Sequence, residues 1–297
     1  MQIVIVYGGT SAERAVSLLS GARVYEALRT KHRVTLFDYC GRLTRKALRQ
    51  MRGSDAVFLA LHGGEGEGGA LQRALEEAGI FHYTGTASEG SAVAMHKANA
   101  KARVVAAGVP VASGAIWRPQ ELCPALPPLP VAIKPLSGGS SIGLRIIKNE
   151  GMLRRYQPTE PMLCEAYLSG REYTVGVLNG TVLPAVEILP RSGTYDYISK
   201  YTAGAAEELC PAPVTRQKRM LLESYATRAF AALSLRDFAR IDFKEDGDGM
   251  PVFLEANTLP GLTETSLMPL AAAAAGLDFF SLCMRMVQMA ANRRRGT

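Results

Sequence analysis

The sequence predicts an α/β protein whose first part is a parallel sheet. Short apolar segments alternate with helix-like segments over the first 84 residues, and this alternation is typical of parallel strands joined by crossover helices. Glycine-rich segments follow the first and third strands, at residues 8–10 and 62–69, where parallel sheets gather their ligands. The expected elements are a strand at 3–7, a helix at 15–29, a strand at 33–38, a helix at 44–51 and a strand at 56–61.

A second pattern begins near residue 84. A helix is expected at 90–107, and strands at 131–134 and 144–148 flank the glycine- and serine-rich segment 137–143, which predicts a mobile hairpin flap. The segment 122–130 carries four prolines and is expected to be a surface connection, because proline cannot donate to a strand ladder. Further strands are expected at 172–178, 182–189, 239–243 and 252–256, and further helices at 216–233 and 279–291.

Composition argues against several classes of protein. The net charge is +7, but Arg293, Arg294 and Arg295 supply three of these charges at what we expect to be a frayed end, so the support for nucleic-acid binding is weak. The five cysteines include no Cys-x-x-Cys pair, which argues against a disulfide framework and a zinc site. The start lacks a basic leader region and the run 266–277 is too short to cross a bilayer, so we expect a cytoplasmic protein.

Four polar residues near the end of the chain form the most informative local group. Side chains two apart on a strand share a face, so Arg240 lies beside Asp242, and Glu255 beside Asn257. If the two strands are neighbours across the turn at 246–249, three oxygen-bearing side chains converge beside one guanidinium. Mg²⁺ prefers oxygen ligands and usually binds through a few carboxylates plus substrate phosphates, which this set can provide. The alternative is an exposed strand face with a surface salt bridge.

Several segments are candidates for binding phosphate, although the chain has no Gly-Lys-Ser/Thr P-loop. The flap can place backbone donors and the hydroxyls of Ser140 and Ser141 over a triphosphate, with Lys97 and Lys134 as point charges on its oxygens. An ordinary hairpin and surface lysines are the alternative. The segment 195–201 combines aromatic residues with Lys200, which suggests an active-site lid or, by default, a surface loop.

Three further features are candidates for a binding site: Glu13 after the first strand, His62 after the third, and the turn at 258–261. Thr10 and Glu13 fit a helix capping box; the alternative is a carboxylate at the end of a strand that receives a substrate ammonium. His62 begins a loop that is too rich in glycine for a core turn. The turn at 258–261 can expose backbone N–H groups, which stabilise oxyanions.

Taken in order, these segments resemble the D-alanine:D-alanine ligase family of the ATP-grasp superfamily. The resemblance implies an N-terminal Rossmann-like parallel-sheet domain at 1–84, an α+β ATP-binding subdomain at 85–170 and an α+β catalytic subdomain at 171–297. The matching runs are 8–14 with 16–18, 62–72, 83–85, 134–135 with 139–143, 170–175, 195–201 and 255–267.

The resemblance also implies an activity. Members of the family join two D-alanines with ATP through an acyl phosphate, and the product serves peptidoglycan precursor synthesis in the cytoplasm. The implied cofactors are ATP and two Mg²⁺ ions, for which Mn²⁺ can substitute. The implied assembly is a homodimer, with no nucleic-acid or membrane partner.

The resemblance assigns a role to each matching residue. Glu13 would hold the first ammonium in a hydrogen-bonded set with Ser140 and Tyr201, and His62 would lie near the first carboxyl group. Arg240 and the Gly261 N–H would stabilise the oxyanion, whereas Ser266 and the Leu267 N–H would seat the second carboxylate. The implied metal ligands are Asp242, Glu255 and Asn257; the phosphate contacts are Lys97, Lys134, Ser141 and Lys200; and the adenine and ribose site holds Glu165, Tyr167, Leu168 and Glu172.

The sequence departs from the family pattern at two positions. Gly68 and His96 stand where the family usually has aspartate. Tyr201 favours a dipeptide ligase over relatives that make D-alanyl-D-lactate. The alternatives are a related ligase for another amino acid or hydroxy acid, a silent nucleotide sensor, and a basic nucleic-acid binder, which the lack of a basic stripe with interleaved aromatics disfavours.

Overall fold

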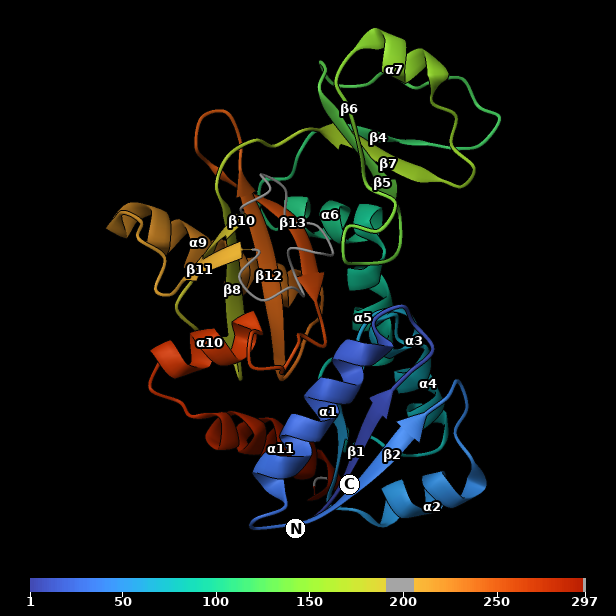
Figure 1. Ribbon diagram of the computed structural model, residues 1–297, viewed down its shortest axis with the longest axis vertical. Helices are drawn as coiled ribbons and strands as arrows, with labels where there is room; N and C mark the ends of the chain where they lie inside the picture. The colour runs from blue at the N-terminus through green and yellow to red at the C-terminus, as the bar shows by residue number, and fades with distance from the viewer. Residues whose placement is uncertain (191–205, 296–297) are drawn as a thin grey trace.

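Three sheets follow one another along the molecule in the computed structural model, which describes residues 1–190 and 206–295 (Figure 1). The N-terminal parallel sheet lies at one end and a small antiparallel sheet at the other, and the largest sheet lies between them. The mixed α/β architecture agrees with the expected fold class.

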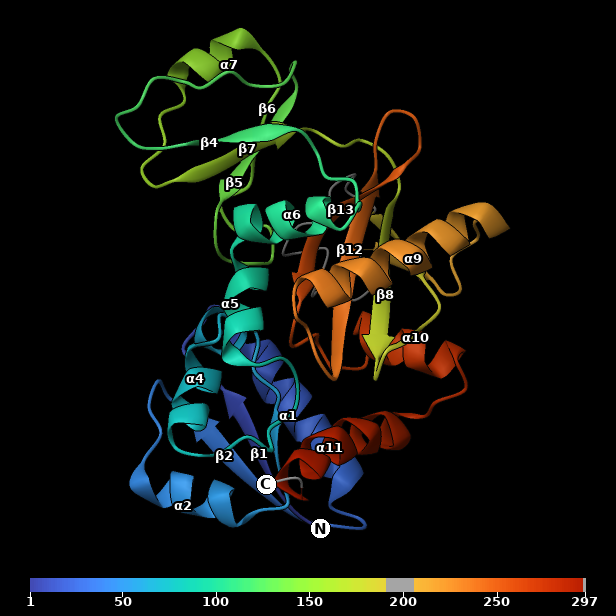
Figure 2. The same ribbon diagram turned by 180° about the vertical axis from the view of Figure 1, so that it is seen from behind.

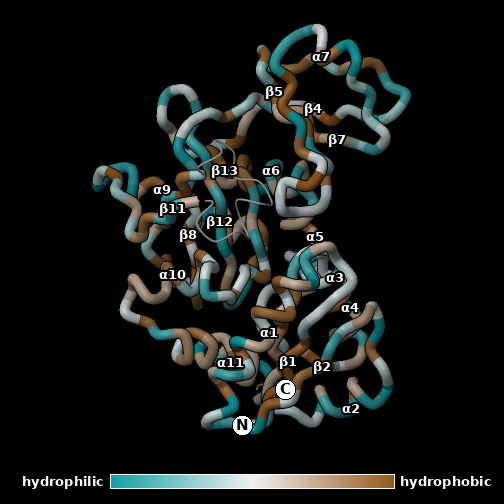
Figure 3. The backbone as a smooth tube through the Cα atoms, in the orientation of Figure 1, coloured by the Kyte–Doolittle hydropathy of each residue, from teal (hydrophilic) through white to brown (hydrophobic). Residues whose placement is uncertain are grey.

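The N-terminal sheet has the parallel strand order β2-β1-β3, as the alternating pattern predicts. β1 is apolar and buried along most of its length (Figure 3), because helices cover both faces of the sheet (Figure 2). α2 begins after Thr44, whose side chain accepts a hydrogen bond from the Ala47 N–H. The elements are β1 (Gln2–Gly8), α1 (Arg14–Leu28), β2 (Arg33–Tyr39), α2 (Arg45–Gly53), β3 (Ala56–Leu59), α3 (Gly64–Glu67) and α4 (Ala70–Glu77).

The last helix, α11 (Phe279–Arg295), returns to this first sheet and packs on α1 and β3. The expectation of a frayed, charged end is wrong for Arg293 and Arg294. Arg293 bonds both carboxylate oxygens of Asp237 and the Phe81 and Tyr83 carbonyls, and Arg294 pairs with Asp55. These arginines therefore tie the helix to the body of the protein.

The small antiparallel sheet has the order β4-β7-β5-β6 and carries one short helix. β5 and β6 pair as neighbours on either side of the flap, as the sequence predicts. β4 and β7 were not predicted. Each is only four or five residues long, which is too short to show a clear alternating pattern. The elements are β4 (Gly114–Trp117), β5 (Val131–Pro135), β6 (Arg145–Ile147), α7 (Glu150–Arg155) and β7 (Met162–Ala166).

The largest sheet is antiparallel, with the order β11-β10-β8-β12-β13 and β9 paired to β8. The expected helix at 90–107 is two helices, because the chain breaks at His96, and the expected strand at 182–189 is two strands. α5, α6 and α9 pack on one side of this sheet, and α10 contacts β8. The elements are α5 (Ser88–Met95), α6 (Lys97–Ala106), β8 (Glu172–Leu178), β9 (Thr181–Val182), β10 (Val186–Pro190), β11 (Ala206–Leu209), α9 (Arg216–Ala232), β12 (Phe238–Glu245), β13 (Pro251–Asn257) and α10 (Leu267–Ala274).

No single helix in the described residues is long and apolar enough to cross a membrane. α10 and residues 279–294 of α11 reach that length and apolarity only as a pair, with a bend of 104° between them.

Candidate active site

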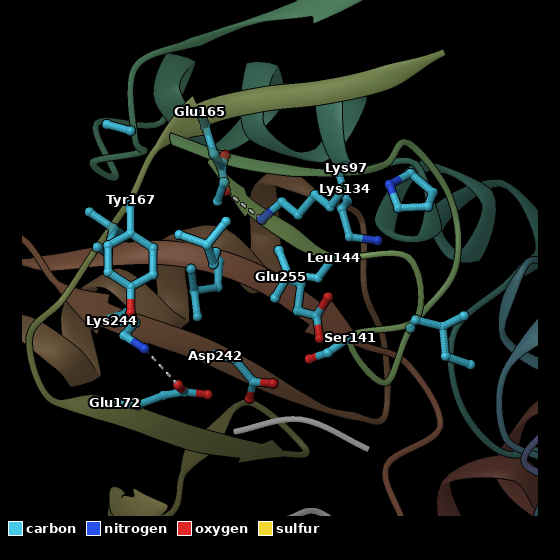
Figure 4. Close-up of a pocket in the computed structure, with 18 residues that line it drawn as sticks. Lys97, Lys134, Ser141, Leu144, Glu165, Tyr167, Glu172, Asp242, Lys244 and Glu255 are labelled. Carbon is cyan, nitrogen blue, oxygen red and sulfur yellow. Dashed lines mark hydrogen bonds and ion pairs between the residues drawn. The ribbon is translucent and has the colours of Figure 1, made fainter. Parts of the chain in front are cut away.

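A large cleft lies between the small antiparallel sheet and the largest sheet. It holds about 920 Å³ of empty space, part of it open to solvent. Figure 4 shows charged side chains reaching into it from both sheets, with Lys134 paired to Glu165 on one side and Lys244 paired to Glu172 on the other. The predicted site residues that line it are Lys97, Lys134, Ser141, Glu165, Tyr167, Leu168, Glu172, Asp242 and Glu255.

β12 and β13 bring the four polar residues of the sequence pattern together. Arg240 is opposite Asn257, and Asp242 is opposite Glu255, so the prediction that these strands are neighbours is confirmed. Asp242 accepts hydrogen bonds of 3.0 Å from Arg240 and 2.9 Å from Asn257. Thr174 on β8 donates a fourth, of 2.6 Å, which fixes the carboxylate from the other neighbouring strand.

The donor set of Asp242, Glu255 and Asn257 fits a hard cation such as Mg²⁺. Asp242 and Glu255 project into the cleft (Figure 4), and Asn257 keeps an amide oxygen as a ligand atom because it bonds Asp242 through its nitrogen. No cluster of three or more His, Cys, Asp or Glu side chains suited to a metal occurs in the part of the chain that the structure describes. Two carboxylates and an amide are therefore a site that a nucleotide's phosphates would have to complete.

Glu165 lies between two lysines at the back of the cleft. Lys101 is 2.8 Å from one of its oxygens and Lys134 pairs with the other. Burial opposes the charged carboxylate, but the two lysines overcome that effect and hold the pKa of Glu165 below its usual value. Burial also lowers the pKa of Lys101 to about 8.

Lys101 and Lys244 are functional candidates that the sequence analysis missed. Lys101 is one helical turn after Lys97 on α6, and that i, i+4 spacing was the available signal. Lys244 shares a strand face with Arg240 and Asp242 through the two-residue alternation of β12. Lys97 itself donates a hydrogen bond of 2.5 Å to the Gly138 carbonyl, so it also holds the base of the flap.

A second, smaller cleft adjoins the first. It holds about 620 Å³ and is lined from the N-terminal sheet, the flap, the largest sheet and the loop before α10. Gly139 lines both clefts, so the two clefts meet at the flap. The predicted site residues that line it are Glu13, His62, Ser140, Arg240, Asn257, Gly261, Ser266 and Leu267.

Glu13 faces this second cleft and does not form a capping box. α1 begins after Glu13, whose side chain makes no capping hydrogen bond. Instead, its carboxylate accepts a hydrogen bond of 2.6 Å from Ser140 on the flap. A Cβ at Gly63, where φ is +63°, would overlap the same carboxylate, so the glycine leaves room for Glu13.

The flap holds two consecutive serines in the left-handed backbone region. Ser140 has φ +53° and Ser141 has φ +58°, which costs about 1–3 kcal/mol for each non-glycine residue. Such strain concentrates at sites where the surrounding contacts impose the conformation. The contact of Ser140 with Glu13 is one of those contacts.

The loop before α10 lines one side of the second cleft. Gly261 lies where a Cβ would meet the Ser266 hydroxyl at 2.7 Å, and this hydroxyl accepts a hydrogen bond of 2.9 Å from the Thr263 N–H. Leu267 is the first residue of α10, so its N–H belongs to the free donors of a helix N-terminus.

Residues 62–69, expected to be a loop, include the short helix α3, and His62 is buried with 6% exposure. Glu67 is a further candidate that lines this cleft. It accepts hydrogen bonds from the Gly63 N–H at 2.7 Å and the Leu259 N–H at 3.4 Å. Burial, with Glu13 nearby, raises the pKa of Glu67 to about 7.

His96 and Gly68, the two residues that depart from the family pattern, lie at the start of α6 and directly after α3. His96 precedes α6 and its Nδ1 accepts a hydrogen bond of 3.3 Å from the Asn99 N–H. An aspartate at this N-cap position can make the same hydrogen bond. His96 therefore performs the capping role that the family's usual aspartate would have. Gly68 has φ −79°, which any residue adopts, but a Cβ there would lie 2.9 Å from the Gly64 carbonyl oxygen, so a larger residue would require a small shift of the backbone.

Tyr201 and Lys200 lie outside the described residues, with the rest of the segment 195–201. Their predicted roles stay predictions.

The two antiparallel sheets and the nucleotide-sized, lysine- and acid-lined cleft between them define an ATP-grasp enzyme. A family model described as "D-ala D-ala ligase C-terminus" matches residues 118–288. A D-alanine–D-alanine ligase from Granulibacter bethesdensis is 42% identical over 304 residues, covering 98% of each chain. The chain belongs to the D-alanine–D-alanine ligase family.

Solved structures give the same result. The crystal structure of a D-alanine–D-alanine ligase from Bacillus anthracis complexed with ATP has a TM-score of 0.82 and 25% identity, and the match covers 100% of this chain and 98% of that one. The VanG D-Ala:D-Ser ligase from Enterococcus faecalis has a TM-score of 0.79 and 25% identity, over 97% of this chain and 99% of that one.

Proposed function

We propose that the protein joins two D-alanines to D-alanyl-D-alanine with ATP, through an acyl phosphate, for peptidoglycan precursor synthesis. The observation that carries this proposal is the contact of the two clefts at Gly139. An amino-acid carboxylate in the smaller cleft lies next to the terminal phosphate of a nucleotide in the larger one. Positioning of this kind is the main catalytic device in phosphoryl transfer.

Residues of the larger cleft bind the nucleotide. Lys97 and Lys134 reduce the repulsion between the phosphates and the attacking carboxylate, because both side chains line the cleft. Asp242, Glu255 and Asn257 would hold Mg²⁺, which supplies further charge neutralisation on the phosphates when it is bound. Glu165 and Tyr167 are at the opposite side of the cleft (Figure 4) and, with Leu168, which also lines the cleft, serve the adenine.

Residues of the smaller cleft hold the two amino acids. Glu13 receives the first ammonium, which leaves the carboxylate near Arg240 and free to attack the γ-phosphate. ADP leaves, and the amine of the second D-alanine then attacks the carbonyl carbon of the acyl phosphate. Arg240 and the Gly261 N–H stabilise the oxyanion, the Ser266 hydroxyl and the Leu267 N–H seat the second carboxylate, and inorganic phosphate leaves.

The flap protects the acyl phosphate. It lies where the two clefts meet, at Gly139, and is held there by hydrogen bonds from Ser140 to Glu13 and from Lys97 to the Gly138 carbonyl. Exclusion of water favours attack by the amine over hydrolysis.

A phosphate-release assay tests the proposal. The purified protein, with ATP, Mg²⁺ and D-alanine, is expected to release phosphate and to form a product with the mass of D-alanyl-D-alanine. L-alanine is the matched control substrate. Absence of both phosphate and dipeptide would contradict the proposed activity.

A related ligation with a different second substrate is the second candidate, because the fold also matches a ligase named for D-Ala and D-Ser. Mixed incubations with D-alanine, D-serine and D-lactate, followed by product mass analysis, distinguish the candidates. Tyr201→Phe tests the role that the resemblance assigns to Tyr201: we expect a lower ratio of D-alanine to D-lactate incorporation, and an unchanged ratio would exclude that role.

The proposal also includes the cellular location, the oligomeric state and the domain boundaries of the protein. The protein would act in the cytoplasm as a homodimer, which cell fractionation and light scattering test. Boundaries near residues 85 and 171 would separate the parallel-sheet domain, the ATP-binding subdomain and the catalytic subdomain. Limited proteolysis with and without ATP tests these boundaries.

A further inference from the structure

His62 lines the smaller cleft, yet both of its ring nitrogens are used inside the protein. Nδ1 is 3.0 Å from the Leu259 carbonyl oxygen, and Nε2 is 2.9 Å from the Ser20 hydroxyl on α1. A neutral imidazole has one donor and one acceptor nitrogen. Both are therefore occupied before any substrate arrives.

The directions of these hydrogen bonds follow from their partners. A carbonyl oxygen only accepts, so Nδ1 of His62 carries the proton and donates to Leu259. The Ser20 hydroxyl accepts from the Leu262 N–H at 3.2 Å, and its own proton then goes to Nε2 of His62. Burial lowers the pKa of His62, which agrees with the neutral ring that this arrangement needs.

The result is one continuous chain of three hydrogen bonds, from the Leu262 N–H through Ser20 and His62 to the Leu259 carbonyl. Its two ends belong to the same short loop, residues 259–262, and Gly261 lies within that loop. We call this segment the Gly261 loop. Ser20 on α1 and His62 after β3 thus hold both ends of a segment whose central residue, Gly261, lines the smaller cleft.

Other contacts show that the N-terminal part holds this loop from several sides. Arg23 on α1 donates to the Leu262 carbonyl at 3.0 Å, and Glu67 accepts from the Leu259 N–H. Of these contacts, only the His62 chain joins both ends of the loop. Ser20 is fully buried and is not among the residues that line the smaller cleft.

We propose that His62 is a positioning residue that sets the Gly261 loop through Ser20, and that it does not bind the substrate carboxyl group by a ring nitrogen. This inference rests on the proposed ligation, in which the Gly261 N–H stabilises the oxyanion. An oxyanion donor acts only when it lies about 2.7–3.1 Å from the developing charge. A loop that shifts therefore slows the chemical step and leaves ground-state binding of the first D-alanine unchanged.

Ser20→Ala is the decisive variant, because it breaks the chain without changing the wall of the cleft. We expect kcat to fall by about 10- to 100-fold, with the KM of the first D-alanine within about twofold of wild type. His62→Ala is expected to give the same pattern. The double variant is expected to be no worse than the poorer single variant, since both remove one chain.

Two further variants separate positioning from loss of folding. His62→Gln keeps a donor and an acceptor on one amide and is expected to recover at least part of the kcat lost in His62→Ala. Ser54→Ala is the matched control: Ser54 is a buried serine with two hydrogen bonds near the opposite end of the first sheet, and its kcat is expected to equal that of wild type.

Wild-type turnover is measured first, so failure of the ligation itself is seen independently. If the wild type is active, an unchanged kcat in Ser20→Ala together with a raised KM of the first D-alanine in His62→Ala would overturn the inference in favour of direct contact. Additive losses in the double variant would also overturn it.

Discussion

Ser140 donates a hydrogen bond of 2.6 Å to the Glu13 carboxylate, although 127 positions separate the two residues. The bond joins the flap of the small sheet to the start of α1 on the N-terminal sheet. The flap that lines the larger cleft is therefore tied directly to the carboxylate that lines the smaller one.

Ser140→Ala tests that coupling. A hydrogen bond to a charged group contributes about 1.5–3 kcal/mol, so we expect kcat/KM for D-alanine to fall by about one to two orders of magnitude. Kinetics of Ser140→Ala, Glu13→Gln and the double variant measure the interaction, and simple additivity would show that the bond carries no coupling. Ser137→Ala, an exposed flap residue, is the control and should behave as wild type.

Lys101→Met tests the buried ion-pair set around Glu165, at the end of the larger cleft where we propose that the adenine binds. Without Lys101, Lys134 is the one remaining ion-pair partner of Glu165 among the residues that the structure describes, so we expect the pKa of Glu165 to rise and its carboxylate to be less firmly held. We expect the KM of ATP to rise about tenfold, with the KM of D-alanine unchanged. Lys46→Met on exposed α2 is the control, and equal changes in both KM values would contradict a specific role in nucleotide binding.

Glu67→Gln tests the buried carboxyl group whose pKa burial raises to about 7. Between its ordinary pKa and about 7, the folded protein holds a proton that the unfolded chain has released, so stability falls as pH rises through this range. The variant has no such group to titrate. Denaturant unfolding is therefore expected to show that Glu67→Gln gains stability relative to wild type from pH 5 to pH 8, and a constant difference would exclude the raised pKa.

Arg293→Ala tests the attachment of α11. Arg293 bonds both oxygens of Asp237 at 2.7 Å, and Asp237 also accepts from the Gly85 N–H at 2.9 Å. Loss of the guanidinium leaves a buried carboxylate, for which we expect a loss of roughly 3 kcal/mol in unfolding free energy. Arg285→Ala, exposed on the same helix, should cost less than about 0.5 kcal/mol; similar losses would indicate a general effect of helix charge.

The parts of the fold that follow from local pattern could be predicted from the sequence. The alternation of strands and helices gave the N-terminal sheet, and the two-residue period gave the shared face of Arg240 and Asp242. Short strands such as β4 could not be found, because four residues contain too little periodicity. The break between α5 and α6 was also missed, since His96 caps a helix in place of the more familiar aspartate.

The site residues could likewise be predicted where a local motif marks them, whereas contacts between residues distant in sequence could not. Residues in dense local motifs, such as Glu13 and Ser140, were identified, but the sequence left open whether Glu13 caps a helix or faces a cleft. Only the contact with Ser140 decides between these alternatives. Arg293 was misjudged for the same reason, because its partners Asp237, Phe81 and Tyr83 are distant in sequence and no local pattern reports them.

The packing of α11 on β3 and α1 has a consequence for folding during translation. Residues 2–59 supply the strands of the first sheet, but the helix that covers part of it comes from residues 279–295. During translation at roughly 5–20 residues per second, apolar surface on the nascent sheet waits on the order of 10–40 s for its cover. Ribosome stalling late in the message would therefore prolong the exposure of the part of the N-terminal sheet that α11 covers.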